Sequence, residues 1–160
     1  LDPVRHGWPM ILRYGMTTAE SWDAPYTRLV DEPLFRFADP GVRIEDACMW
    51  HEDGLYQMLL NDLTGKITGE DHSGVHAWSA DAKRWQVADP PPAYSRTVLW
   101  DDGGRVKQGS LERPQVLLQD GVPTHLFCAT ADGPGGFHKA TNTWNMVIPL
   151  AKRANQRVTT

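Results

Sequence analysis

The chain has 160 residues, of which 41% are hydrophobic and 22% charged, and its formal net charge at pH 7 is -4. This length fits one domain, and the excess of acids without any long basic run argues against nucleic acid as a partner. No apolar run approaches the roughly 18 residues that cross a bilayer, and residues 1–13 lack a basic stretch followed by an apolar core. We therefore predict no membrane partner and no signal peptide in this chain, and the compartment stays open.

Apolar residues come in short runs separated by Gly, Pro, Asp and Asn, which is typical of strands and turns. In chain order, the predicted strands cover residues 10–14, 43–50, 55–61, 74–79, 97–100, 115–118, 124–129 and 143–149. Only residues 151–157 have a helical pattern, and 12 Pro with 14 Gly indicate many tight connections. The sequence predicts an all-β fold with a short C-terminal helical tail.

Two sets of matched residues indicate an internal repeat. The first set lies 67 positions apart and pairs Glu45 with Glu112, Asp53-Gly54 with Asp120-Gly121, and Leu59 with Leu126. The second set lies 58 positions apart and pairs Ala19, Ser21, Asp23 and Ala24 with Ala77, Ser79, Asp81 and Ala82. Each unit of about sixty residues has room for four strands, and four antiparallel strands around a shared axis make a propeller blade.

The repeat predicts a partial β-propeller of about two to three four-stranded antiparallel blades. We expect a single domain over residues 1–160, an incomplete propeller with approximate units at 1–40, 44–87 and 111–150. A closed propeller has about 4 to 8 blades, so we expect the chain to lack an N-terminal portion. Its open blade edges would need covering, which predicts a homo-oligomer.

Two Asp-Gly pairs predict hairpin turns. A two-residue turn of the primed type needs positive φ, which Gly adopts freely and Asp tolerates. Asp53-Gly54 and Asp120-Gly121 should therefore join the first and second strands of successive blades. The segment 79–85 predicts a turn into an outer strand anchored by Trp85.

Cys48 and Cys128 each lie in an apolar stretch, 80 positions apart. They form no pair or cluster with the spacing of a zinc site, so we expect no structural metal. Both are interpreted as small buried hydrophobes, and the sequence leaves their redox state open.

Acidic residues recur at the start of the innermost strand of two predicted blades. Glu45-Asp46 stands in one blade and Glu112-Arg113 in the next. Two carboxylates brought from neighbouring blades into one cleft suit glycosidic cleavage, in which one group donates a proton and another charge raises its pKa. The alternative is that these residues satisfy strand ends or form surface ion pairs.

These residues belong to a longer series of motifs. In chain order the series is IED at 44–46 with Trp50, DGLYQM at 53–58, GVHAWSAD at 74–81, ERPQ at 112–115 and PTHLF at 123–127. It resembles the five-bladed β-propeller glycoside hydrolases related to glycoside hydrolase family 43, and matches their C-terminal two to three blades only. The resemblance implies an enzyme that cleaves furanosides and pyranosides such as arabinans and xylans.

The resemblance also implies roles for two acids. Family members use a general base, a pKa-modulating Asp and a general acid; by position Asp46 matches the modulator and Glu112 the acid. Two residues depart from the family pattern, because Ala47 replaces a Pro and Arg113 a Gly. The base has no counterpart, so we expect weak or no activity from this chain alone.

Five further residues are candidates for binding the carbohydrate. Glu45 and Arg113 adjoin the two acids, His76 falls in the segment that resembles a sugar-binding strand of the family, and Trp50 and Trp78 are placed to stack on a sugar ring. Ordinary core packing explains the tryptophans and the histidine equally well. We expect no cofactor and leave open a central cation near His76. The second functional hypothesis is a noncatalytic carbohydrate-binding or homo-oligomeric interaction domain.

Overall fold

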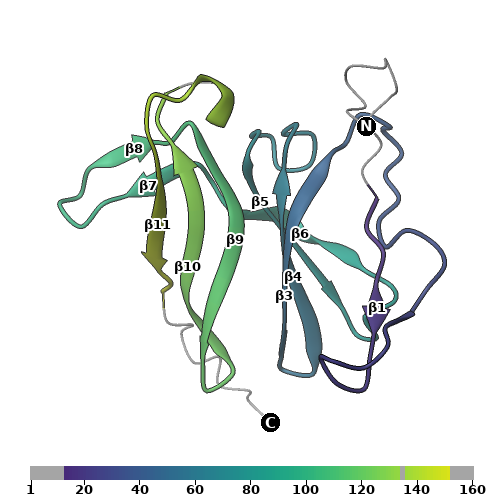
Figure 1. Cartoon of the computed structure of the whole chain (residues 1–160). Helices are drawn as coiled ribbons and strands as arrows, with labels where there is room; N and C mark the ends of the chain where they lie inside the picture. Colours follow the sequence, from purple (N-terminus) through teal and green to yellow (C-terminus); the bar gives the residue numbers. More distant parts are fainter. Residues whose placement is uncertain (1–12, 134–135, 152–160) are drawn as a thin grey trace, which may run out of the picture.

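A computed structural model describes residues 13–133 and 136–151 (Figure 1). The strands are β1 (Thr17–Thr18), β2 (Thr27–Arg28), β3 (Ile44–Glu52), β4 (Leu55–Asp62), β5 (Ser73–Ser79), β6 (Gln86–Tyr94), β7 (Thr97–Leu99), β8 (Arg105–Lys107), β9 (Ser110–Gln119), β10 (Val122–Ala131) and β11 (Thr143–Pro149). The described residues contain one short helix, the 3-10 helix η1 (Phe137–Lys139). The all-β prediction is confirmed, and the arrangement is that of a partial, propeller-like domain. The predicted helical tail lies almost entirely outside the described residues.

The first sheet is a four-stranded antiparallel meander in the order β3-β4-β5-β6. A turn of two residues joins β3 to β4, and both of them have positive φ, 52° at Asp53 and 76° at Gly54. The equivalent turn between β9 and β10 repeats this geometry, with φ of 51° at Asp120 and 80° at Gly121. The two predicted Asp-Gly hairpins are therefore confirmed.

β6 contains three consecutive prolines, at positions 90–92, and the apolar pattern does not predict it as a strand. Proline lacks the N–H that an interior strand must donate. β6 tolerates the prolines because it is an edge strand that pairs on one side only, with β5. β8 is not predicted either, because its three residues are all exposed and form no apolar run.

The second sheet has the order β11-β10-β9, and all three strands are antiparallel. The repeat predicts a fourth strand, whereas the described residues continue beyond β11 only to Ala151. β7 and β8 form a separate hairpin, and β1 and β2 are the only strands found in the described part of the predicted N-terminal unit. Most of the strand predicted at 10–14 lies outside the described residues.

One face of the first sheet packs against the segment that precedes it. Its buried residues are Ile44, Met58, Leu60, Val75 and Ala77, and they pack in one cluster with Leu34, Phe35 and Trp85. The Trp85 ring lies 6.4 Å from that of Phe35, and its Nε1 donates to the carbonyl of Ala82 at 2.9 Å. Burying each such large side chain contributes about 1.5–3 kcal/mol. Trp85 therefore anchors the entry into β6, as predicted.

The opposite face of the first sheet packs against the second sheet. Cys48 and Leu59 from the first sheet join Leu111, Leu126 and Cys128 in one cluster. Both cysteines are buried free thiols, and burial raises the pKa of Cys128 to about 12. This packing places β3 beside β9 at the centre of the molecule (Figure 1).

The 67-residue offset of the repeat holds for the inner strands β3 and β9. Between the second strands, β4 and β10, the offset is one residue longer. A bulge between Pro123 and His125 adds a residue to β10. As a result Leu59 pairs with Cys48 in the first sheet, whereas Phe127 occupies the corresponding place in the second. The counterpart of Leu59 is thus Phe127 and not Leu126, which corrects the alignment of the repeat. Leu59 is covered by the second sheet, and Phe127 remains 38% exposed.

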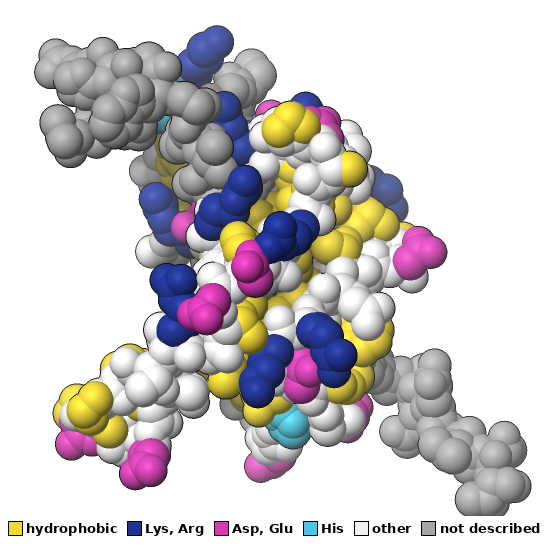
Figure 2. Space-filling model, turned by 90° about the vertical axis from the view of Figure 1, so that its right-hand side faces the viewer, with side chains coloured by type: hydrophobic (Ala, Val, Ile, Leu, Met, Phe, Trp, Pro, Cys, Tyr) yellow, Lys and Arg dark blue, Asp and Glu magenta, His cyan; other side chains and the backbone are white. Residues whose placement is uncertain are grey.

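Basic and acidic side chains are interspersed on the face shown in Figure 2, within the part drawn in colour. No large patch of one sign covers this part of the surface. Among the described residues, no helix has the length and apolar character needed to cross a membrane.

Candidate functional site

Three carboxylates meet where β3 and β9 begin. One oxygen each of Glu45, Asp46 and Glu112 lies within 4.8 Å of the other two. Glu45 and Asp46 are half-buried, and Glu112 is 6% exposed. The structure therefore brings together the two glutamates that the repeat paired and Asp46, on neighbouring inner strands.

A β-bulge in each inner strand, β3 and β9, sets the direction of these side chains. In β3 the bulge falls between Glu45 and Cys48, and Asp46 has φ of 57°. In β9 the equivalent residue, Arg113, has φ of 53°. Positive φ is uncommon outside glycine, and bulges of this kind redirect side chains at functional sites. The same local distortion thus occurs at both positions that the repeat aligned.

The other two acids contribute to a raised pKa of Glu45. Burial raises the pKa of Glu45, and the negative charges of Asp46 and Glu112 raise it further, against smaller opposing effects of Arg113 and His72. Burial also raises the pKa of Tyr14, with Asp46 and Glu45 contributing next. A carboxyl group that holds its proton to higher pH than usual is suited to donate it.

His72 supplies the positive partner of this cluster. Its Nδ1 lies 2.7 Å from Oε1 of Glu112, whose side chain is only 7% exposed. The contact with Glu112 raises the pKa of His72, although burial opposes the effect. Sequence reasoning assigns no role to His72, because 40 positions separate it from Glu112 and no motif links them.

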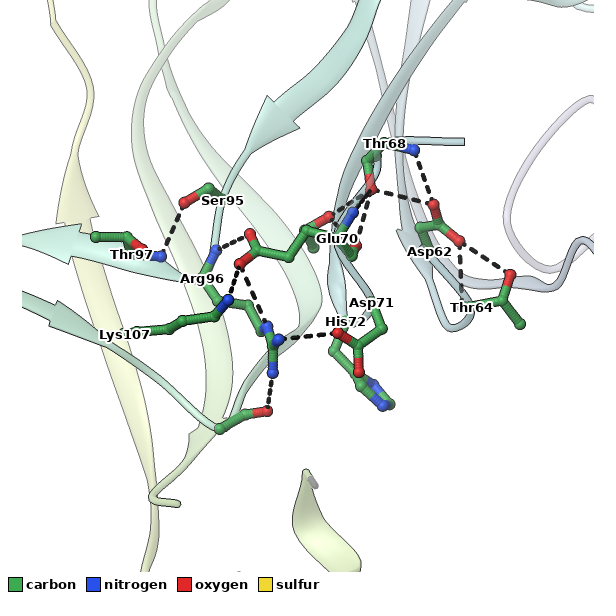
Figure 3. A network of polar contacts seen from close by, with 12 residues as sticks. Asp62, Thr64, Thr68, Glu70, Asp71, His72, Ser95, Arg96, Thr97 and Lys107 are labelled. Carbon is green, nitrogen blue, oxygen red and sulfur yellow. Dashed lines mark hydrogen bonds and ion pairs between the residues drawn. The ribbon is translucent and has the colours of Figure 1, made fainter. Parts of the chain in front are cut away.

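A polar network holds the loop that carries His72 (Figure 3). Nη2 of the buried Arg96 contacts Oδ1 of Asp71 at 2.8 Å, and its Nη1 donates to the carbonyl of Gly109 at 2.7 Å. The backbone N–H of Arg96 donates to Glu70 at 2.9 Å, and the N–H of Leu111 donates to the carbonyl of His72 at 3.2 Å. The loop is thereby fastened to the start of β9, next to Glu112.

The same loop is organised around Asp62, at the end of β4. Asp62 is fully buried, and its two carboxylate oxygens accept five hydrogen bonds; those from Thr64 and Thr68 are drawn in Figure 3. The donors are the N–H and hydroxyl of Thr64, the N–H of Ile67, and the N–H and hydroxyl of Thr68. One carboxylate thus replaces the regular backbone pairing that the loop lacks.

Asn61 lies beside the acids and is not predicted from the sequence. It pairs directly with Glu45 across β3 and β4, so the two side chains share one face of the sheet. Asn61 is fully buried, and neither atom of its side-chain amide has a hydrogen-bond partner within the described structure. Buried amides without partners are rare, and strain, a catalytic role, or a bound water or ion can account for them.

Among the described residues, Arg113 forms no ion pair with Glu112. Its guanidinium lies over the Phe137 ring, 5.8 Å from the centroid, and the residue is exposed. Among the described residues, the ion pair to Glu112 comes from His72 instead.

Two other predicted binding residues line a separate cleft between the two sheets. The cleft has a volume of about 1240 Å³, and both Trp50 and His76 line it, together with Tyr94 and His125. Nε2 of His76 lies 2.8 Å from Oε1 of Gln57, and Nε1 of Trp50 donates to Oε2 of Glu52 at 3.1 Å. The three acids do not line this cleft, and Trp78, on β5, lies in neither place.

A group of three carboxylates is also a set of oxygen ligands that suits a divalent cation. Within the described ranges, no comparable group of three ligands includes His76. Among the described residues, the acid cluster is thus a group whose geometry could hold a cation, and the cation near His76 stays a prediction.

The pairing of His72 with Glu112 predicts a pH-dependent contribution to stability. Because the pKa of His72 is raised on folding, the contribution is complete below the unfolded value near 6.5 and is lost as pH rises through the folded value. Replacing His72 by Gln should lower the free energy of unfolding by about 0.5–1 kcal/mol at pH 5.5 and hardly at all at pH 9, since the ring is partly solvated. Urea unfolding at both pH values tests this, with the exposed His138→Gln as control. A loss that is equal at both pH values would contradict it.

No family model matches the chain, and no curated protein matches its sequence. Two solved structures are similar in fold, one described as a glycoside hydrolase and the other as a complex of BT0996 with RGII. Their sequences are 14% and 13% identical to this chain, and the TM-score is 0.59 for each. The matched region covers 91% of this chain but 38% of each of those chains. At this identity the likeness concerns the fold alone, which is glycoside hydrolase-like.

Proposed function

We propose that this chain is a carbohydrate-active domain of the glycoside hydrolase type, built on blades like those of the five-bladed propellers related to family 43. The observation that carries the proposal is the convergence of Glu45, Asp46 and Glu112 within 4.8 Å, at equivalent bulges of two inner strands. Glycoside hydrolysis requires a pair of carboxyl groups with different pKa values. Burial and the charges of Asp46 and Glu112 raise the pKa of Glu45, so this cluster holds a carboxyl group that is suited to keep a proton.

Hydrolysis of aryl glycosides tests this proposal. A panel of nitrophenyl arabinofuranosides, xylosides and galactosides should reveal slow release of nitrophenol from at least one member. Replacing Glu112 by Gln should lower the rate about 10²–10⁴-fold, because one of the two carboxyl groups is lost. The matched control is Glu20→Gln, which changes an exposed glutamate in the N-terminal segment and should leave the rate unchanged.

A second candidate function is noncatalytic binding of a carbohydrate in the cleft between the sheets. The cleft is lined by Trp50, His76 and Tyr94, and rings of this kind stack on sugar faces. Saturable binding of oligosaccharides without turnover, abolished by Trp50→Ala and unaffected by Glu112→Gln, would favour this function over hydrolysis.

A further inference from the structure

One face of the first sheet is a packing surface for another sheet. It carries a row of three side chains that pair across β3, β4 and β5, namely Cys48, Leu59 and His76. The second sheet packs on this face, and Cys48 and Leu59 are buried as a result. The repeat therefore predicts that the corresponding face of the second sheet also packs against a sheet.

That corresponding face, the outer face of the second sheet, is open in the part of the chain that the structure describes. Its row consists of Gln115, Phe127 and Val147, which pair across β9, β10 and β11. Leu117 follows Gln115 on the same face of β9, at the position of Trp50 in the first sheet. Phe127, Leu117 and Val147 are between 38% and 51% exposed. Three large apolar side chains from adjacent strands thus form one patch, and contiguous apolar patches mark interaction sites.

The outer face is uncharged. Six residues alternate onto it from the three strands: Gln115, Leu117, Phe127, Ala129, Asn145 and Val147. Glu112 pairs with Ala129 at one end of the face, but it is buried and forms an ion pair with His72. A second copy of this face would therefore bring no like charges together, which is the usual obstacle to self-association.

The repeat also limits how two copies can meet. The face that packs on Leu59 carries Leu111, whose counterpart in the first sheet is Ile44. Ile44 already packs with Leu34 and Phe35, so a head-to-tail neighbour has no such face to offer. The arrangement that remains is isologous, in which the outer face of one copy packs on the same face of the other across a twofold axis.

We infer that two copies of this chain associate through the outer face of the second sheet, with Phe127 at the centre of the contact. β10 is the middle strand of that sheet, so the Phe127 ring projects from the middle of the face. Antiparallel sheets packed in this way lie about 10 Å apart, with their strands within about 30° of each other. The contact uses a face of the sheet rather than the open blade edges considered from the sequence, and it does not rest on the proposed function.

Sedimentation velocity and light scattering on the whole chain, over a wide range of concentration, test this contact. The chain should form a dimer that dissociates on dilution. Phe127→Lys should raise the dissociation constant about 100-fold or more, because a symmetric contact loses the ring twice. Leu117→Lys should act in the same direction, and Phe127→Leu, which keeps an apolar side chain, should retain the dimer. The matched control is Val106→Lys, which changes an exposed valine of β8 and should leave the dissociation constant unchanged.

Three results would overturn the inference. The first is a monomer at every concentration, and the second is an open-ended series of larger species, which a head-to-tail contact produces. The third is a dimer that neither Phe127→Lys nor Leu117→Lys weakens, because its contact would then lie elsewhere, for example at the edge of β11. Circular dichroism checks that the variants fold, and since the two exposed residues lie on different strands, either folded variant gives the readout.

Discussion

Replacing Asp62 by Ala should lower the free energy of unfolding by about 3 kcal/mol, because it leaves the backbone N–H groups of three half-buried residues without acceptors. Those N–H groups belong to Thr64, Ile67 and Thr68 and bond to Asp62 at 2.9–3.2 Å. Each unsatisfied donor costs about 1–3 kcal/mol, and partial access of water reduces the sum. For a chain of this size the loss corresponds to a fall in Tm of about 6–12 °C.

Urea unfolding followed by tryptophan fluorescence measures this loss. Asp62→Asn retains one acceptor oxygen and should cost about half as much, which distinguishes the hydrogen bonds from simple side-chain volume. Asp101→Ala, in the exposed turn of the β7–β8 hairpin, is the control and should change stability by less than about 0.5 kcal/mol. If Asp62→Ala were as stable as this control, the loop would not depend on the carboxylate.

Replacing Gly109 by Ala should destabilise the fold by about 3 kcal/mol or more, since the added methyl group would meet main-chain atoms. A Cβ at this position would lie against the carbonyl oxygen of Gly133 and 2.7 Å from that of Asp132. Main-chain atoms cannot rotate away, so β9 would have to separate from the end of β10. That movement would break the 2.7 Å hydrogen bond from the Gly109 N–H to Ala131. Overpacking usually costs about 1–3 kcal/mol, and a clash with backbone falls at the upper end.

Two other glycine substitutions provide the comparison. A methyl group added at Gly15 would meet no atom within 4 Å, and the residue has no positive φ, so Gly15→Ala should be nearly neutral. At Gly74 the obstruction is the Tyr94 ring, a side chain that can shift, and the loss should be intermediate. Thermal unfolding of the three variants should rank their losses of stability, with Gly109→Ala the largest, Gly74→Ala intermediate and Gly15→Ala the smallest. A Gly109→Ala variant no less stable than Gly15→Ala would show that the two strands can separate without cost.

The strands that the sequence predicts well have an uninterrupted pattern between clear turn signals. Residues 143–149 are predicted and observed as the same strand, and residues 55–61 end one residue short of β4. β9 begins at Ser110, five residues before its predicted start, because the bulge at Arg113 interrupts the alternation of apolar and polar residues. Sequence patterns detect regular pairing and pass over the places where pairing is distorted.

The residues of the candidate site are likewise only partly predictable from the sequence. The repeat aligned Glu45 with Glu112, and the structure places both at one bulged end of the inner strands. His72 could not be predicted, because its contact with Glu112 depends on a loop shaped by Asp62 and fastened by Arg96. Such residues carry no motif of their own, and only the folded arrangement relates them to the acids.

The two outer strands of the sheets differ in their capacity to recruit foreign strands. In β6 the prolines at 90–92 remove three consecutive N–H donors, so the edge of the first sheet is a poor template for addition of another chain. β11 reads TWNMVIP, carries no charge, and pairs with β10 alone among the described strands. Its first six residues, TWNMVI, contain no proline, and uncharged segments of this length and β-propensity are the ones that nucleate cross-β assembly. Aggregation of this protein should therefore start at β11, and a lysine in place of Val147 would act there as a gatekeeper.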